Sequence, residues 1–387
     1  MAEIPGIFFA FLRLGLTSFG GPVAHLGYYR AELVYRRRWL DDATFADIVA
    51  LTQSLPGPGS TQVCYTVGLL RGGLAGGLAA WLGFTLPSAI LMTLFAYGIT
   101  WFHGPLGVGA LHGLRVVAVA VVAQAVYGMA RRLCPDLARG GIAIVAALIG
   151  QAPAILIGGL AGLVLCRRAA ARVQSTPLHV PIKRAVSIGA LIVFAVLLAA
   201  LPLCARLSHN HAVELFDSFY RTGAMVFGGG HVVLPLLETS VVRTGWMGNQ
   251  AFLAGYGAAQ AIPGPLFTFS AYLGAAMAPA PHGVVGAAIC LIAIFLPGLL
   301  LVTGALPFWN ELRSRAWAQA VLAGVNAAVV GLLAAAFYKP VWTGTIFNLG
   351  DFAFALAAFL ALAVGKAPPL WVVLGGALAG ALLGVLG

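Results

Sequence analysis

Charged side chains are scarce in this sequence. Only 9% of its 387 residues are Asp, Glu, Lys or Arg, while 61% are hydrophobic; a water-soluble domain carries about 25% charged residues. The scarcity excludes a protein whose whole outer surface meets water. The apolar residues form continuous runs rich in Gly, Ala and Leu, not the short alternating strands of a membrane β-barrel. We therefore expect an all-α polytopic membrane protein in the lipid bilayer. Runs near the roughly 20 residues that cross a bilayer lie at 74–101, 107–130, 141–166, 186–204, 284–306, 316–337, 352–364 and 370–386.

Acidic residues and cysteines are few as well. Lys and Arg number 22 against 11 Asp and Glu, a formal charge of +11. In a soluble chain this excess would suggest nucleic acid, but here basic loops that fix membrane orientation explain it, and no nucleic-acid partner is expected. The five cysteines are scattered and form no CxxC, so neither a disulfide framework nor a metal site is indicated. We interpret them as small packing residues.

Catalytic fingerprints are missing too. The sequence has no GxxxxGK[ST] and no HExxH, the patterns of nucleotide and metal-dependent hydrolysis, and no GxSxG nucleophile elbow. We therefore expect no enzyme activity and no cofactor. Any transport would be driven by ion or solute gradients, or by a separate partner.

What the chain does contain is one broken hydrophobic stretch that occurs twice, at 11–59 and 219–266. The matched residues are Arg13 and Arg221, Phe19-Gly20-Gly21 and Phe227-Gly228-Gly229, Trp39 and Trp246, Gln53 and Gln260, and Pro56-Gly57-Pro58 and Pro263-Gly264-Pro265. The register continues with Pro87 against Pro297 and Tyr127 against Tyr338. We divide the chain into an N-terminal repeat (1–166), a basic cytoplasmic linker (167–184) and a C-terminal repeat (185–387).

The basic residues of matched loops alternate between the halves. The loop after the first broken helix holds Arg30 and Arg36 to Arg38, whereas its counterpart holds only Arg243. The loop around His103 has no basic residue, whereas its counterpart holds Arg313 and Arg315. Since basic residues favour the cytoplasmic side, the halves are predicted to lie in opposite orientations. This is the inverted-topology repeat of secondary transporters, with ten to twelve membrane segments at roughly 20 residues each.

Each Pro-Gly-Pro separates two apolar pieces too short to span alone. Residues 42–55 and 59–70 would each be roughly 20 Å long, and Pro breaks a helix where Gly permits a turn. We predict half-helices that meet inside the membrane, with Asp41 or Asp42, and Asn249 in the second copy, as the outer N-cap. Irregular backbone at that depth must be buried in protein or line a cavity. The free N–H groups of Gly59, Ser60 and Thr61 would then suit an anion. The alternative is a proline kink that binds no ligand.

Three arginines are candidate contacts for that anion. Arg13 interrupts an apolar segment, which is costly and marks a functional candidate, although it could instead extend to the membrane surface. Arg221 has Asp217 one turn before it and could be neutralised in place. Arg115 is matched in the second half by the uncharged Asn326. This difference in charge suits one site rather than two equal ones. The Gly20-Gly21 break has its own alternative, close packing of helices.

The same residues carry a resemblance to a known family. The stretches FGGPVAHLGYYRAELV, RWLDDATFADIVALTQSLPGPGSTQ and GFTLPS, with FGGGHVVLPLLE, GWMGNQAFLAGYGAAQAIPGPLFTFSAYLGA and FLPG, resemble the chromate ion transporter (CHR) family. The resemblance implies a long-chain, two-domain protein of the bacterial inner membrane that exports chromate, an analogue of sulfate. The family motif positions present here are Gly20, Gly21, Pro22, Gln53, Pro56, Gly57 and Pro58, with Gly228, Gly229, Gln260, Pro263, Gly264 and Pro265. Gly230-His231 stand where the first half has Pro22-Val23, so the two breaks need not be equivalent.

We expect a secondary transporter that exports chromate and confers chromate resistance. One rival is a permease for sulfate or another oxyanion, and a rival of another class is a membrane-embedded enzyme. The expected contacts are Arg13, Arg115, Arg221, Ser60, Thr61 and the motif positions above. The coupling ion and the oligomeric state are left open, with a homodimer as one option.

Overall fold

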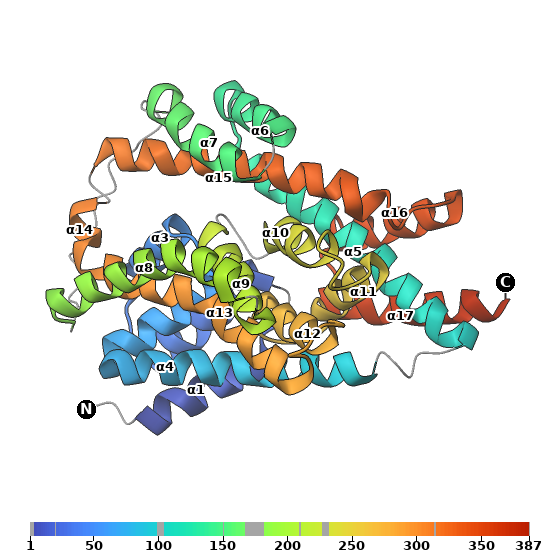
Figure 1. The fold of residues 1–387 in the computed structure, drawn as a ribbon, viewed down its shortest axis with the longest axis horizontal. Helices are drawn as coiled ribbons and strands as arrows, with labels where there is room; N and C mark the ends of the chain where they lie inside the picture. Colours follow the sequence, from blue (N-terminus) through green and yellow to red (C-terminus); the bar gives the residue numbers. More distant parts are fainter. Residues whose placement is uncertain are drawn as a thin grey trace.

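A computed structural model describes residues 4–19, 21–98, 104–149, 151–166, 182–208, 210–226, 232–312 and 315–386. Every regular element in these ranges is a helix (Figure 1). Five of the helices are long and apolar enough to cross a membrane, and further apolar helices are shorter. The fold is that of an all-α polytopic membrane protein, as predicted.

The first half contains two breaks at the predicted places. α1 ends at Thr17 and α2 begins at Gly21, and α3 ends at Ser54 while α4 begins at Gly59. α4 is itself interrupted at Gly72 and Gly73, which have non-helical backbone angles. Its residues before this break form the half-helix, and those after it form a span. The elements are α1 (Ile4–Thr17), α2 (Gly21–Tyr29), the π-helical η1 (Arg30–Arg36), α3 (Asp42–Ser54), α4 (Gly59–Gly98), α5 (Gly104–Leu133), α6 (Leu137–Ile149) and α7 (Gln151–Leu165).

The second half repeats this order. Its elements are α9 (His211–Met225), α10 (Val233–Leu237), η5 (Glu238–Val242), α11 (Asn249–Ala259), η6 (Leu266–Thr268), α12 (Phe269–Ala276), α13 (Gly283–Ala305), η7 (Leu306–Phe308), α14 (Trp309–Leu312), α15 (Ala316–Ala336), η8 (Phe337–Trp342), α16 (Leu349–Ala363) and α17 (Pro369–Leu386). α8 (Arg184–Ser208) stands between the two sets, without a counterpart among the described helices. Residues 167–181 of the predicted linker lie outside the described part.

The outer end of α3 is capped as predicted, but the matched end is not. Asp41 accepts a 2.7 Å hydrogen bond from the N–H of Thr44, the arrangement expected of an N-cap. This bond holds the pKa of the Asp41 carboxyl below its ordinary value. The prediction that Asn249 caps α11 was wrong. Gly248 is the N-cap there and makes no side-chain bond.

Equivalent long helices of the two halves run in opposite directions. Gly283, at the start of α13, lies against the hydroxyl of Tyr97 near the end of α4. Further along, the rings of Phe295 and Trp81 are 5.9 Å apart. In the same direction, residue numbers therefore increase along α13 and decrease along α4. This antiparallel pairing of matched helices supports the inverted repeat.

The last helices of each half pack on the long helix of the other half. α17 lies along α5, where Gly113 approaches Gly376 and Gly380, and α7 lies along α15, where Gly324 approaches Gly158 and Gly162 (Figure 1). Small residues four apart let helix backbones approach closely in membranes. The terminal helix of each half thus packs against the opposite half, and the two halves are interlocked.

Candidate functional site

The two Pro-Gly-Pro turns meet broken helices of the opposite half. The N–H of Gly57 donates to the Val226 carbonyl at 2.6 Å, and the N–H of Gly264 donates to the Ser18 carbonyl at 2.9 Å. Ser18 and Val226 each directly precede a matched Phe-Gly break. The contacts are therefore reciprocal, as a pseudo-two-fold arrangement requires. We call this junction the crossing.

Glycine is required at the centre of both turns. Gly57 has φ +126° and Gly264 has φ +105°, angles that residues with a Cβ rarely adopt. Space is short as well: a Cβ on Gly57 would lie 3.0 Å from Gly298 Cα, and one on Gly264 would lie 2.7 Å from Ser88 Oγ. Gly298 follows the matched proline of α13, and Ser88 follows that of α4. Each turn thus packs on the proline segment of the opposite half's long helix.

The first turn of α4 offers unused donors at the crossing. The earliest helical bond runs from the N–H of Gln62 to the Pro58 carbonyl, so the N–H groups of Gly59, Ser60 and Thr61 precede the helical ladder. Ser60 Oγ lies 3.2 Å from Nδ1 of the buried His25. The Thr61 hydroxyl is fully buried and has no hydrogen-bond partner in the part of the chain described.

The amide of Gln53 lies over the same helix start. A Cβ on Gly59 would be 3.2 Å from Gln53 Nε2. The predicted Gln53, Ser60 and Thr61 are therefore brought together at the start of α4, beside Pro56, Gly57 and Pro58. His25 joins them through its contact with Ser60.

Gln62 was not predicted, yet it links the halves. Its Nε2 donates to the Pro56 carbonyl at 2.9 Å and to the Gly298 carbonyl at 3.2 Å, and the side chain is fully buried. The available signal was a lone amide in the apolar segment after a Pro-Gly-Pro turn.

We expect Gln62→Leu to lower the melting temperature of the purified protein and to reduce transport. It leaves two buried carbonyls without their donor, a loss of about 1–3 kcal/mol for each unsatisfied group. Gln250→Leu, at an exposed position of α11, is the matched control and should melt like the unaltered protein. Equal melting of both variants would contradict the structural role of Gln62.

The matching turn in the second half is built differently. Pro265 leads into a short 3₁₀ turn, where the Thr268 hydroxyl donates to the Pro265 carbonyl at 2.8 Å. α12 then extends only from Phe269 to Ala276. Gln260 is 8% exposed at the end of α11, and Ser270 is fully buried. The two half-helix starts are therefore not equivalent, and the longer run of free N–H groups belongs to α4.

A second feature that was not predicted is an ion pair of the same spacing in both halves, one residue out of the matched register. Glu32 accepts from Arg37 at 2.7 Å, and Glu238 pairs with Arg243 at 3.4 Å. Both pairs sit on π-helical turns, whose i to i+5 hydrogen bonds align residues five apart. The identical Glu-x₄-Arg spacing was the signal that could have found them.

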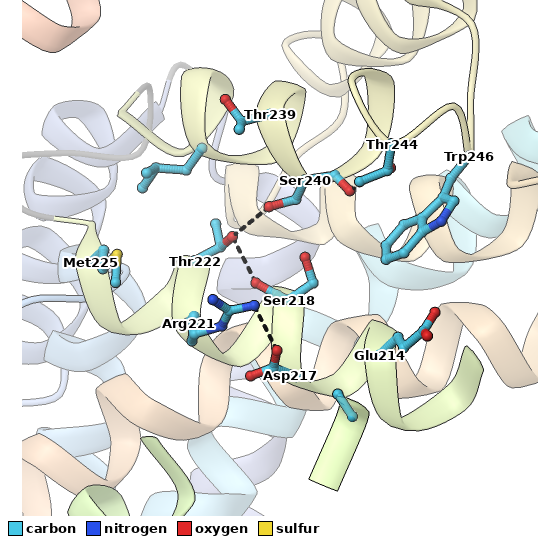
Figure 2. Close-up of a pocket in the computed structure, with 12 residues that line it drawn as sticks. Glu214, Asp217, Ser218, Arg221, Thr222, Met225, Thr239, Ser240, Thr244 and Trp246 are labelled. Carbon is cyan, nitrogen blue, oxygen red and sulfur yellow. Dashed lines mark hydrogen bonds and ion pairs between the residues drawn. The ribbon is translucent and has the colours of Figure 1, made fainter. Parts of the chain in front are cut away.

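A cavity of about 460 Å³ lies between α9 and the α10–η5 segment (Figure 2). Arg221 projects into it, and its Nη2 is 2.6 Å from Asp217 Oδ2. The ion pair predicted from the spacing is thus present. Met225 and Trp246 mark opposite ends of the view. The remaining lining residues are Ala205, Glu214, Ser218, Thr222, Leu236, Thr239, Ser240 and Thr244.

Arg13, matched to Arg221, occupies a different environment. Both arginines are exposed, but no hydrogen bond or ion pair joins the Arg13 guanidinium to the described residues. The difference follows from the residue one helical turn earlier, which is Asp217 before Arg221 and Phe9 before Arg13. The structure does not place Arg13 at the crossing.

Arg115 lies away from the α4 helix start, on α5. It is 7% exposed, and its Nε donates weakly to the Leu111 carbonyl at 3.4 Å. Asp351 of α16 is near enough to interact with its charge and bonds His112 at 2.7 Å. Arg115 therefore belongs to a polar cluster between the halves.

Some predicted positions cannot be located in this arrangement. Gly20, Gly228 and Gly229 lie outside the described residues. Gly21 is the first residue of α2, directly followed by Pro22. Within the described ranges, no group of three or more His, Cys, Asp or Glu side chains could hold a metal ion.

Comparison with known proteins agrees with this two-part organisation. The family model described as "Chromate transporter" matches residues 6–166 and 213–381. A chromate transport protein of Pseudomonas aeruginosa is 31% identical over 347 residues, covering 86% of this chain and 79% of the relative. One of Cupriavidus metallidurans is 26% identical, covering 84% and 80%, and an uncharacterized transporter of Methanocaldococcus jannaschii is 26% identical, covering 85% and 82%. No solved structure matches the chain. Because the family model covers both halves, the chain belongs to the chromate transporter family.

Proposed function

We propose that the protein is a secondary transporter that carries chromate, a divalent tetrahedral oxyanion, out of the cytoplasm of a bacterial cell. The observation that carries the proposal is the reciprocal crossing, in which the Gly57 and Gly264 turns bond the opposite half. Broken helices at the junction of inverted repeats form the substrate sites of many secondary transporters. The names of the relatives from Pseudomonas aeruginosa and Cupriavidus metallidurans supply chromate as the cargo.

The start of α4 has the chemistry to replace water around an oxyanion. Burying a charge is costly unless donors replace its hydration, and the N–H groups of Gly59, Ser60 and Thr61 lie at the positive end of the helix dipole. Gln53 adds an amide over the same turn. The site would therefore bind through hydrogen bonds at its centre.

The arginines would contact the anion on its path to and from the start of α4 rather than at that central site. Arg221 lies on α9, whose C-terminal neighbour Val226 reaches the crossing. Arg115 lies on α5 next to Leu114, which packs against Gly257 of α11. Arg13, exposed on α1, would attract the anion at the rim.

The membrane potential can drive this export. One elementary charge is worth about 2.3 kcal/mol per 100 mV, so a dianion gains about 4.6 kcal/mol per 100 mV on leaving an inside-negative cell. Export then needs no coupled proton. Rocking of the interlocked halves would expose the crossing to each side in turn.

Everted membrane vesicles test this proposal directly. Labelled chromate should accumulate inside vesicles that contain the protein, more strongly when a lumen-positive potential is imposed, and sulfate should compete. Vesicles without the protein are the control. No accumulation under a potential, proton gradient or counter-anion gradient would contradict export, and accumulation only in right-side-out vesicles would indicate an oxyanion permease.

A further inference from the structure

The cavity between α9 and η5 holds its cation in a neutralised state. Arg221 is the cation among the lining residues, and its Nη2 already donates to Asp217 Oδ2 at 2.6 Å. Asp217 is buried, and its other carboxylate oxygen has no donor among the described residues. Glu214 lines the same cavity and bonds His211 at 3.1 Å. In this state the cavity repels an anion.

Three threonine hydroxyl groups that line the cavity are also directed away from an anion. Thr222, Thr239 and Thr244 donate their protons to helix carbonyls, at 2.9 Å, 3.0 Å and 2.8 Å respectively. These three threonines then offer a ligand only oxygen lone pairs. Hydroxyl protons can rotate, however, and a freed guanidinium is a strong oxyanion partner. The same side chains can therefore bind an oxyanion once Arg221 leaves Asp217.

The cavity adjoins the crossing, and its ion pair belongs to the second half. Met225 lines it, and the next residue, Val226, accepts the Gly57 N–H. In the register that matches Arg13 with Arg221, Phe9 stands in place of Asp217. The first half therefore cannot form the same pair.

The loop charges assign a side to the cavity. Arg30 and Arg36 to Arg38 lie in the loop that precedes α3, whereas the matched loop before α11 holds only Arg243. Basic loops favour the cytoplasm. The loop beside Trp246 at the end of the cavity is then on the opposite side of the membrane.

We propose that this cavity is the oxyanion's exit site on the extracytoplasmic side, and that Asp217 promotes release by competing with the anion for Arg221. The inference rests on the proposed function, because it assigns a side and a step to that transport. A carboxylate held within hydrogen-bond distance of the one cation among the described lining residues displaces a bound dianion and keeps it from returning. Asp217 is a positioning residue that acts through Arg221.

Binding to the purified full-length protein tests the competition without transport. Equilibrium dialysis with chromate, and separately with radiolabelled sulfate, should show that Asp217→Asn lowers the dissociation constant about tenfold, since one repelling charge near the anion is removed. Arg221→Gln should raise it about tenfold for the converse reason. Asp136→Asn is the matched control, because Asp136 forms an exposed pair with Arg139 at 2.7 Å, and it should leave binding unchanged.

The direction of transport gives a second readout. In everted vesicles the lumen corresponds to the extracytoplasmic side, so luminal sulfate should slow chromate entry far more in Asp217→Asn than in the unaltered protein. Melting temperatures of all variants establish that each is folded. Unchanged binding and unchanged luminal inhibition in folded Asp217→Asn would overturn the inference. It would also be overturned if the unaltered protein bound Na⁺ but bound neither chromate nor sulfate. If the unaltered protein fails to accumulate chromate, the proposed function falls, while the order of dissociation constants still tests the competition.

Discussion

Gly57→Ala should abolish chromate accumulation in everted vesicles and lower the yield of folded protein. At φ +126° a side chain is strained by about 1–3 kcal/mol. The new Cβ would also lie 2.7 Å from Gln62 Nε2 and 3.0 Å from Gly298 Cα, and overpacking typically costs about 1–3 kcal/mol more. The turn can relieve both only by moving, which would break the 2.6 Å bond from Gly57 to Val226.

Gly264→Ala should have the same effect through the opposite half. Its φ is +105°, and its Cβ would lie 2.7 Å from Ser88 Oγ, a side chain that can rotate, so we expect a smaller loss of stability. Gly27→Ala in α2 is the control: no atom lies within 4 Å of the added Cβ, and alanine favours a helix over glycine by about 1 kcal/mol. Transport at the unaltered level in Gly57→Ala would contradict the crossing.

Gly113→Leu should prevent the halves from interlocking. A Cβ at Gly113 would meet the Gly376 carbonyl and come within 3.1 Å of Gly380 Cα, so the added side chain would force α17 off α5. The expected result is loss of the monodisperse peak in size-exclusion chromatography and loss of transport, since overpacking by several atoms exceeds the usual cost of about 1–3 kcal/mol.

The same helix provides the control. Gly128→Leu, also on α5, adds its side chain where no atom lies within 4 Å, and should fold and transport normally. Gly324→Leu, at the matched contact of α15 with α7, should fail like Gly113→Leu because its Cβ would lie 2.7 Å from Gly162 Cα. A normal elution profile for both Gly113→Leu and Gly324→Leu would exclude this packing as a requirement for folding.

Local chemistry made much of the fold predictable. Proline has no N–H and glycine tolerates positive φ. The Pro-Gly-Pro turns therefore predicted the ends of α3 and α11 without any knowledge of how those segments pack. The Gly20-Gly21 break was visible for a similar reason. The duplicated order of residues identified two copies of one unit, and the loop arginines predicted their opposite orientation.

Parts of the candidate site were also visible in the sequence. Gln53, Ser60 and Thr61 lie within a few residues of Pro56-Gly57-Pro58, so a single turn of backbone brings them together. Asp217 and Arg221, one helical turn apart, were expected to pair and do. Gln62 escaped notice because its acceptor at Gly298 belongs to the distant half.

The sequence by itself thus determined the membrane class, the duplication and the places where helices break, because these depend on composition and on the backbone chemistry of neighbouring residues. Only the tertiary structure decided that Gly57 bonds Val226 and Gly264 bonds Ser18. It also decided that α17 packs on α5, and that Arg221 and Asp217 line a cavity. Those outcomes depend on which surfaces meet across the two halves and on the unmatched α8. Contacts between distant segments follow from packing, which no local pattern of residues records.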